Sequence, residues 1–358
     1  MTQKQKATLD DIAKLANVSK TAVSMILNEK EGVSFLNETV ERVFEAANRL
    51  GYTKKDSRHN RNKVFNENTI LVLSPSVTNP YYATLIQSIE QMAATKELRI
   101  IVINTFRDKS KELEAINMIK GSNLYGIIST MTPQCVAELE EINLKIPVAV
   151  ISDKGNDFDL DTVEINNYSA GVLIAKHMIE LGHKNVAYVS TTLDSVNNAR
   201  IRRLDGIRDT YKNLCPQGKI TVKSSNVSPE EELNDIDIEH SIGYELALEV
   251  LKIPEITGFI AVNDMVAYGV MDALLDKNYK IPRDYSICGF DNLFPSRFNN
   301  ISLTSVEHHI INKGQNSVEM LINRHESSRS SYSSTKILYK HELIIRNSTS
   351  TPREIKAK

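Results

Sequence analysis

The stretch TLDDIAKLANVSKTAVSMILNEKEGVSFLNETVERVFEAANRLG (residues 8–51) carries the strongest structural signal in this 358-residue sequence. Apolar residues recur in it at helical spacing three times, which predicts three short amphipathic helices. Thr8, with Asp11 three residues later, predicts the capped start of the first helix, and Asn17 predicts its left-handed end. Ser19 opens the second helix, and Gly51 ends the third. The apolar faces are expected to be Leu9, Ile12, Ala13 and Ala16, then Ala22, Val23, Ile26 and Leu27, then Val40, Val43, Phe44, Ala47 and Leu50.

The short connection between the first two helices predicts a helix-turn-helix, in which the second helix enters the major groove of DNA. Periodicity alone leaves open a plain three-helix bundle. Charge favours the DNA-binding interpretation, since residues 1–63 hold 12 Lys/Arg against 8 Asp/Glu, whereas the remainder holds 31 against 37.

The stretch resembles the DNA-binding headpiece of the LacI/GalR family of bacterial transcription regulators, whose pattern is T-x-x-D-[IV]-A-x-x-A-x-V-S-x-x-T-V-S-x-[VI]-[LI]-N with a later L-G-Y. The positions on this pattern are Thr8, Asp11, Ile12, Ala13, Ala16, Val18, Ser19, Val23, Ser24, Leu27, Asn28, Leu50, Gly51 and Tyr52. The resemblance implies a homodimer that binds a palindromic operator in double-stranded DNA.

Docking geometry selects residues of this headpiece for contact with DNA. Lys20 and Thr21, in the first turn of the second helix, are expected at base edges. Met25 stands where relatives often carry Arg, so we expect it to pack against a base and to shift the base preference. The alternative is that the side chains of Lys20 and Met25 are merely solvated or face the core of the head. Ser19, Ser24, Asn28 and Ser34 are expected at phosphate oxygens, and Thr8 and Tyr52 complete the predicted DNA-binding set.

Residues 53–68, TKKDSRHNRNKVFNEN, are predicted to form a polar, basic linker after a headpiece at 1–52. Family members carry here a hinge helix that wedges a Leu into the minor groove. This sequence departs from that pattern and shows no evident wedge residue. Arg58 and Arg61 are expected to enter the minor groove electrostatically instead.

Composition indicates a soluble globular protein, with 41% hydrophobic and 25% charged residues. The N-terminus is polar and no apolar run approaches ~18 residues, so neither a signal peptide nor a membrane partner is expected. Three scattered cysteines, Cys135, Cys215 and Cys288, are typical of reduced thiols. We therefore expect a cytoplasmic protein.

Apolar strand-like runs alternate with helical patterns from residue 69 onward, which predicts two α/β lobes with doubly wound parallel sheets. The first lobe is expected at about 69–166 and 303–324, and the second at about 167–298 and 335–347, followed by a tail at 348–358. Open α/β sheets bind ligands beyond the carboxyl ends of their strands, so an effector is expected in the cleft between the lobes.

The family resemblance continues through this body, which is similar to periplasmic sugar-binding proteins. ELGHKNVAYVS, RRLDGI, VNDMVAYGV, IPRDYSICGFDN and ISLTSV fall on family motifs. The resemblance implies polar ligand contacts at Arg203, Asn263 and Asp291, an aromatic wall at Tyr81 or Tyr82, and further contacts at Ser152, Asp153 and His308. Arg200 and Arg202 remain alternatives to Arg203. Carboxylate, amide and guanidinium groups together suit a polyol better than a flat purine.

The sequence therefore predicts a sugar-responsive transcriptional repressor acting as a homodimer. A nucleobase- or phosphosugar-responsive regulator with corepressor behaviour remains the first alternative, and a stand-alone small-molecule receptor the second. G-x-G-x-x-G after the first strand, Walker A, H-E-x-x-H and G-x-S-x-G motifs are all missing, which disfavours an enzyme. No cofactor or metal is expected.

Overall fold

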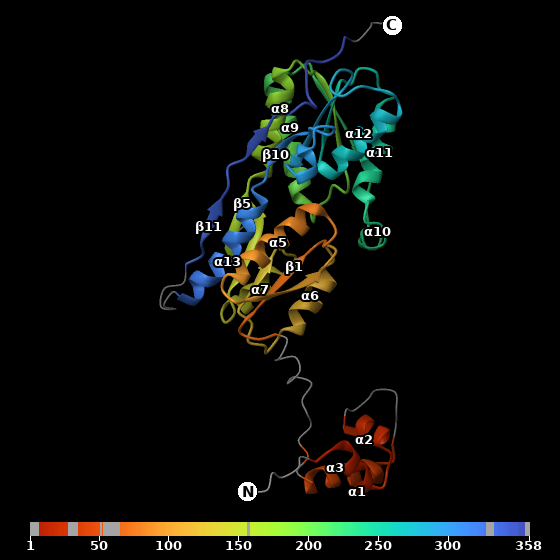
Figure 1. Ribbon diagram of the computed structural model, residues 1–358, viewed down its shortest axis with the longest axis vertical. Coiled ribbons are helices and arrows are strands. Elements are labelled where there is room, and N and C mark those ends of the chain that lie inside the picture. The colour runs from red at the N-terminus through yellow and green to blue at the C-terminus, as the bar shows by residue number, and fades with distance from the viewer. Residues whose placement is uncertain are drawn as a thin grey trace. The chain divides into compact units, whose positions relative to one another are not determined.

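The computed structural model describes residues 7–27, 35–50, 52, 65–155, 158–326 and 333–354. The chain divides into two compact units, a head at Met1–Val64 and a body at Phe65–Lys358 (Figure 1). Gly51, Asn28, Ser34, Arg58 and Arg61 lie outside the described residues, as does most of the linker. The predictions made for them therefore stay predictions.

The head consists of helices α1 (Leu9–Ala16), α2 (Lys20–Leu27) and α3 (Asn37–Arg49). Thr8 caps α1, because its hydroxyl accepts from Asp11 N at 3.3 Å while the Asp11 carboxylate accepts from Thr8 N at 2.8 Å. Asn17 ends α1 in the left-handed conformation with φ 51°. The three helices share a core of Ile12, Ala13, Ala16, Val23, Ile26, Val43, Ala46 and Ala47. The predicted three-helix head is thus confirmed.

The apolar face predicted for α3 is partly wrong. Phe44 is 42% exposed and Leu50 37% exposed, whereas Ala46 is buried. Successive helical positions are rotated by about 100°, so a stripe centred on Val43 and Ala47 leaves Phe44 to one side. Ala46 and Ala47 belong instead to the core that α3 shares with α1 and α2.

The first sheet of the body is entirely parallel, with strand order β11-β5-β4-β3-β1-β2. Its strands are β1 (Thr69–Ser74), β2 (Arg99–Asn104), β3 (Gly126–Ser129), β4 (Val148–Asp153), β5 (Asp161–Ile165) and β11 (Lys336–Leu338). Helices α5 (Pro80–Ala94), α6 (Lys109–Met118), α7 (Val136–Asn143) and α13 (Ile310–Glu326) belong to this lobe. Continuous burial of β1, β3, β4 and β5 is what helices on both faces of a parallel sheet produce.

The second sheet has strand order β12-β10-β9-β8-β6-β7, parallel except for the antiparallel edge strand β12. Its strands are β6 (Asn185–Ser190), β7 (Lys219–Ser224), β8 (Gly258–Ala261), β9 (Ser286–Asp291), β10 (Thr304–Glu307) and β12 (Glu342–Ile344). Its helices are α8 (Asn167–Glu180), α9 (Asn198–Leu214), α10 (Pro229–Asn234), α11 (Ile238–Val250) and α12 (Asp264–Asp276), with a 3₁₀ turn η1 (Phe294–Arg297). The two-lobed α/β architecture predicted for the body is confirmed.

The predicted assignment of the C-terminal segments to the lobes is wrong in two places. Strand β10, expected in the first lobe, pairs with β9 in the second sheet, and only the following α13 packs in the first lobe against α5. Strand β11, expected in the second lobe, pairs with β5 in the first sheet. The chain therefore crosses between the lobes after β5, after β10 and again after β11.

The predicted C-terminal tail is packed onto the second lobe as far as the structure describes it. Ser348 is 1% exposed, and its hydroxyl donates to Ile287 O and accepts from Thr304 N, both at 2.7 Å. Arg353 donates to Pro254 O at 3.0 Å. No helix within the described ranges is long and apolar enough to cross a membrane.

His183 ties the C-terminal segment to the second sheet. Its Nδ1 lies 2.7 Å from Thr257 Oγ1, and its Nε2 lies 3.0 Å from Ser286 Oγ and from Ser350 O. Burial lowers the pKa of His183 from 6.5 to about 4. The imidazole is therefore neutral in the folded protein near pH 7.

We expect the free energy of unfolding to fall as the pH drops from about 6.5 to about 4. In this window the unfolded chain binds a proton at His183 that the folded chain excludes, and the full difference amounts to roughly 3 kcal/mol. Above pH 6.5 the imidazole is neutral in both states and its contribution is constant. Urea unfolding of wild type and His183→Gln across this range measures the effect. Equal slopes of stability against pH in the two proteins would contradict it.

Candidate functional site

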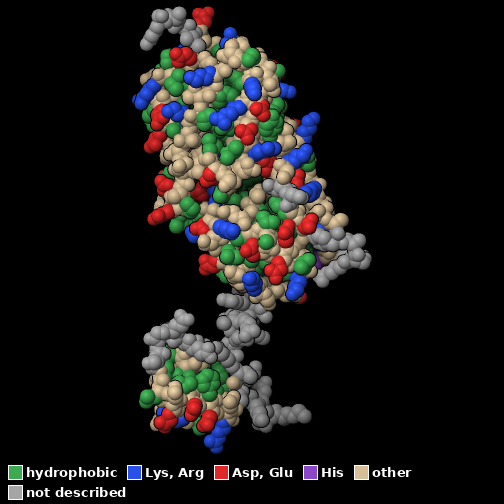
Figure 2. All heavy atoms as spheres, turned by 180° about the vertical axis from the view of Figure 1, so that it is seen from behind, with side chains coloured by type: hydrophobic (Ala, Val, Ile, Leu, Met, Phe, Trp, Pro, Cys, Tyr) green, Lys and Arg blue, Asp and Glu red, His purple; other side chains and the backbone are tan. Residues whose placement is uncertain are grey.

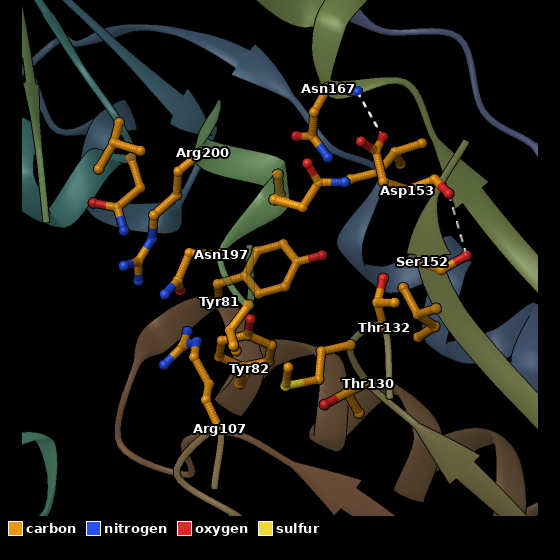
Figure 3. A pocket seen from close by; sticks show the side chains of 18 of the residues that line it. Tyr81, Tyr82, Arg107, Thr130, Thr132, Ser152, Asp153, Asn167, Asn197 and Arg200 are labelled. Carbon is orange, nitrogen blue, oxygen red and sulfur yellow. Dashed lines mark hydrogen bonds between the residues drawn. The ribbon is translucent and has the colours of Figure 1, made fainter. Parts of the chain in front are cut away.

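A cavity of about 260 Å³ lies where the carboxyl ends of strands from both sheets meet. Asp153 closes β4 of the first sheet and Asp291 closes β9 of the second, and both line the cavity. Figure 3 shows Arg107 and Arg200 on one side with Asn197 between them, and Asp153 and Asn167 across from them. The cavity therefore combines polar groups from both lobes at the place where such sheets bind ligands.

Seven of the eight predicted ligand contacts line this cavity. They are Tyr81, Tyr82, Ser152, Asp153, Arg203, Asn263 and Asp291. His308 is not among the lining residues. It is completely buried behind Asp291, with 3.1 Å between His308 Nδ1 and Asp291 Oδ1. The predicted direct ligand contact at His308 is therefore wrong for this structure, because the imidazole has no exposed surface and Asp291 lies on the cavity wall instead.

Arg203 projects from α9 and is held by its own lobe. Its Nε donates to Asn167 Oδ1 at 2.8 Å and its Nη1 donates to Val262 O at 2.5 Å. The guanidinium carbon lies 4.6 Å from the centre of the Phe290 ring, and Nη2 is 3.9 Å from Asp291 Oδ1. Such anchoring fixes the direction of the remaining donors. Of the two alternatives, Arg200 also lines the cavity, whereas Arg202 does not and its side chain is 43% exposed.

Asp291 is the most deeply embedded carboxyl group of the cavity. Burial raises its pKa well above the ordinary value, and the nearby Arg203 opposes that rise. Its φ of 108° lies in a region that side chains other than glycine rarely adopt, which indicates that the surroundings force this conformation. Lys313 of α13 donates to the Tyr81 hydroxyl nearby, and burial lowers the pKa of Lys313 to about 7.

The remaining predicted contacts are partly engaged within the protein. Asp153 Oδ1 accepts from Lys154 N and Asn167 N, both at 3.0 Å, and burial raises its pKa. Asn263 caps α12, because its Oδ1 accepts from Val266 N at 2.9 Å. Tyr81 and Tyr82 meet edge to face, with ring centres 4.9 Å apart at 85°.

Several lining residues escaped prediction. They include Asn79, Arg107, Thr130, Thr132, Gln134, Asn197 and Glu239. Arg107, Thr130 and Thr132 follow β2 or β3 directly, so their position just after a strand was a usable signal. Glu239 lies in the first turn of α11, and nothing in its sequence surroundings marks it.

Every arginine that lines the cavity faces a carboxylate. The shortest distances are 2.6 Å for Arg107–Glu232, 3.6 Å for Arg200–Glu239 and 3.9 Å for Arg203–Asp291. The cavity is therefore strongly polar, and each of its guanidinium groups has an acidic partner. In the described part of the chain, no cluster of three His, Cys, Asp or Glu could hold a metal ion.

The head exposes part of its predicted DNA-contact set. Lys20 and Thr21 are exposed at the start of α2, and Lys20 Nζ lies 2.6 Å from Asp10 Oδ2. Met25 is half-buried. The Ser19 hydroxyl accepts from Ala22 N at 3.1 Å, and Tyr52 packs against the core of the head.

On the body, Lys and Arg alternate with Asp and Glu over the surface seen in Figure 2. Ser24 and Thr8, the other described members of the set, lie on α2 and at the start of α1. The start of α2, where Lys20 and Thr21 are exposed, is the candidate nucleic-acid interface.

Comparisons with known proteins match both units. "Bacterial regulatory proteins, lacI family" matches residues 8–55, and "Periplasmic binding proteins and sugar binding domain of LacI family" matches residues 67–346. The HTH-type transcriptional repressor PurR of Haemophilus influenzae (strain PittEE) is 27% identical over 321 residues, which are 89% of this chain and 91% of the relative. The NTD biosynthesis operon regulator NtdR of Bacillus subtilis (strain 168) is 28% identical over 344 residues, 96% of this chain and 99% of the relative.

Solved structures show the same fold. A LacI family transcriptional regulator from Enterococcus faecalis V583, with bound ribose, superimposes with a TM-score of 0.66 at 27% identity and covers 79% of this chain and 99% of its own. A LacI family regulator from Silicibacter pomeroyi covers 97% of this chain and 100% of its own, with a TM-score of 0.70 at 21% identity.

Proposed function

Because this chain belongs to the LacI family of bacterial regulatory proteins, and is thus a DNA-binding transcriptional regulator, we propose that it is a repressor controlled by a small neutral sugar. The sugar binds in the cavity between the lobes of the body. Its binding changes how tightly the heads hold operator DNA, by the difference in its affinity for the two conformations of the body.

The proposed operator is a palindrome bound by a homodimer. The head supports DNA binding through the exposed Lys20 and Thr21 at the start of α2. An apolar surface on the second lobe supports self-association, since Phe294 is 70% exposed and Phe298 43% exposed, with their rings in edge contact at 5.1 Å. Aromatic residues are enriched in contacts between protein chains.

The pairing of each cavity arginine with an acidic side chain is the observation that carries the choice of effector. A phosphorylated sugar would need a cation free to neutralise it, yet Arg107, Arg200 and Arg203 each face a carboxylate. Paired guanidinium and carboxylate groups still offer donors and acceptors to hydroxyl groups. A neutral polyol therefore fits better than an anion, and the ribose bound to the Enterococcus faecalis relative supports this class.

A nucleobase effector is disfavoured by the aromatic lining. Tyr81 and Tyr82 are the aromatic residues among the described lining residues, and their rings stand nearly perpendicular. A planar base stacks on the face of an aromatic ring, and two perpendicular rings cannot both stack on the same base. The homology to PurR repressors thus concerns the family and the fold.

A thermal-shift screen of the full-length protein tests the proposal. Neutral pentoses and hexoses, their phosphates and purine bases are compared with and without a DNA duplex selected for binding. A neutral sugar is expected to raise the midpoint and to change the affinity for the duplex, and the direction of that change identifies it as an inducer or a corepressor. Stabilisation by a purine or a phosphate alone would overturn the choice of effector.

Met25→Arg is expected to change the base preferred at one symmetric pair of operator positions. Arg can donate two hydrogen bonds to guanine, whereas Met offers only apolar contact, a difference of about 1–3 kcal/mol between bases. Selection of bound sequences from a pool of random DNA duplexes measures the base preferred at these positions. Glu45→Gln, on the exposed surface of α3, changes the charge of the head equally and serves as the control. Identical selection profiles for Met25→Arg and wild type would place Met25 away from the bases.

A further inference from the structure

The two lobes are joined across the edge of the cavity by an ion pair. Arg107, just after β2 of the first lobe, donates through Nη1 to both carboxylate oxygens of Glu232 on α10 of the second lobe, at 2.6 and 2.8 Å. The side chains are only 15% and 18% exposed. Hydrogen bonds between charged groups that are largely withdrawn from water are the strong ones.

A second connection lies beside the first. Asn79, which caps α5 of the first lobe, donates through Nδ2 to Glu239 Oε2 at 2.7 Å. The same oxygen accepts from Asn263 Nδ2 of the second lobe at 2.9 Å, and Arg200 approaches the other oxygen at 3.6 Å. The Glu239 carboxylate thus contacts residues of both lobes, and a sugar bound in the cavity would do the same.

Helix α10 holds Glu232 in place, although no apolar pattern in the sequence marks this helix. Ser228 and Glu231 form a reciprocal cap, with Ser228 N donating to Glu231 Oε2 at 2.7 Å. Just before them, Val227 N donates to Thr192 Oγ1 at 2.7 Å and so anchors the segment to the lobe. In Figure 1 α10 lies at the edge of the second lobe that faces the first. Glu232 itself does not line the main cavity.

We propose that Arg107–Glu232 and Asn79–Glu239 form an inter-lobe clasp that holds the lobes closed before any effector binds. Glu232 is then a positioning residue that sets effector affinity without touching the effector, a role that rests on the proposed function. These bonds exist only in the closed arrangement, so they raise its population in the free protein. Apparent affinity for a ligand of the closed form scales with that population.

The test measures closure directly and needs neither effector nor DNA. Spin labels are attached to the exposed positions Lys120 of the first lobe and Lys252 of the second as K120C and K252C, since the native cysteines are buried. Pulsed electron–electron distance measurements then compare the labelled wild type, Glu232→Gln and Glu230→Gln in the full-length chain. Glu230 is an exposed glutamate of the same helix and serves as the matched control.

Glu232→Gln is expected to lower the ratio of closed to open molecules about tenfold, from loss of a charge-assisted bond. Glu230→Gln is expected to match wild type. The charge-swapped pair Arg107→Glu with Glu232→Arg is expected to regain the closed population, which a merely structural role of Glu232 would not produce. Superimposable distance distributions for Glu232→Gln and wild type would overturn the clasp. Failure of the proposed function would appear separately, as a wild type that responds to no sugar.

Discussion

Asp291→Ala is expected to weaken the response to the effector about 100-fold or more while leaving operator binding intact. The carboxylate lies at the end of β9, buried in the cavity, with Arg203 3.9 Å away on the neighbouring helix α9. Its removal deletes an acceptor for sugar hydroxyls and takes away the acidic group beside Arg203, which keeps its hydrogen bonds to Asn167 and Val262. Loss of one hydrogen bond to a charged group accounts for tenfold or more in affinity, and an unpaired buried charge adds to the loss. The head is a separate compact unit and keeps its own core.

Titration of the sugar identified by the thermal-shift screen, followed by the same titration with operator bound, measures this effect. Asp291→Asn keeps the shape and an acceptor, so it should retain more affinity than Asp291→Ala and also guard against loss of folding. Asp284→Ala is the control, because this carboxylate precedes the opposite end of β9 and does not line the cavity. Wild-type affinity in Asp291→Ala would place the effector outside this cavity.

The sequence predicted those cavity residues that are polar and stand at the end of an apolar strand. Ser152, Asp153 and Asp291 stand at the carboxyl ends of apolar strands, and parallel strands bring those ends to one edge. The positions of Glu239 and of helix α10 could not be predicted from the sequence. Glu239 starts an ordinary helix, and α10, which carries Glu232, is six residues long with no buried side chain, so no apolar period announces it.

The exchange of segments between lobes also has a physical reason. Strand β10 reads as a short run that could extend either parallel sheet, because both sheets bury such strands on both faces. Its partner is chosen by side-chain contacts far apart in the sequence. Ser305 Oγ donates to Asp264 Oδ1 at 2.6 Å and accepts from Asn292 N at 3.0 Å, which fixes β10 beside β9. His308, the residue after β10, is consequently buried in the interior.

Asp264, the second residue of the N-D motif, is expected to be the largest single contributor to stability among the polar residues around the cavity. It is fully buried and accepts from Leu293 N at 2.8 Å, Ser296 Oγ at 2.6 Å and Ser305 Oγ at 2.6 Å. Asp264→Ala leaves all three donors without their acceptor, which is expected to lower the free energy of unfolding by about 3–5 kcal/mol. Burial raises the pKa of Asp264 to about 6, so the carboxylate is largely ionised at pH 7.5, where the measurement belongs.

Chemical unfolding of the full-length chain, followed by a spectroscopic signal that arises from the body, measures this loss of stability. The exposed Glu255→Ala should stay within about 0.5 kcal/mol of wild type, and Asp264→Asn should fall between the two because it keeps one acceptor. The segment after β9 is held by two of these bonds, from Leu293 and Ser296, so Asp264→Ala should also weaken sugar binding although Asp264 does not line the cavity. A stability equal to wild type would mean that water replaces the carboxylate at these donors, and the motif would then owe its role to Asn263 alone.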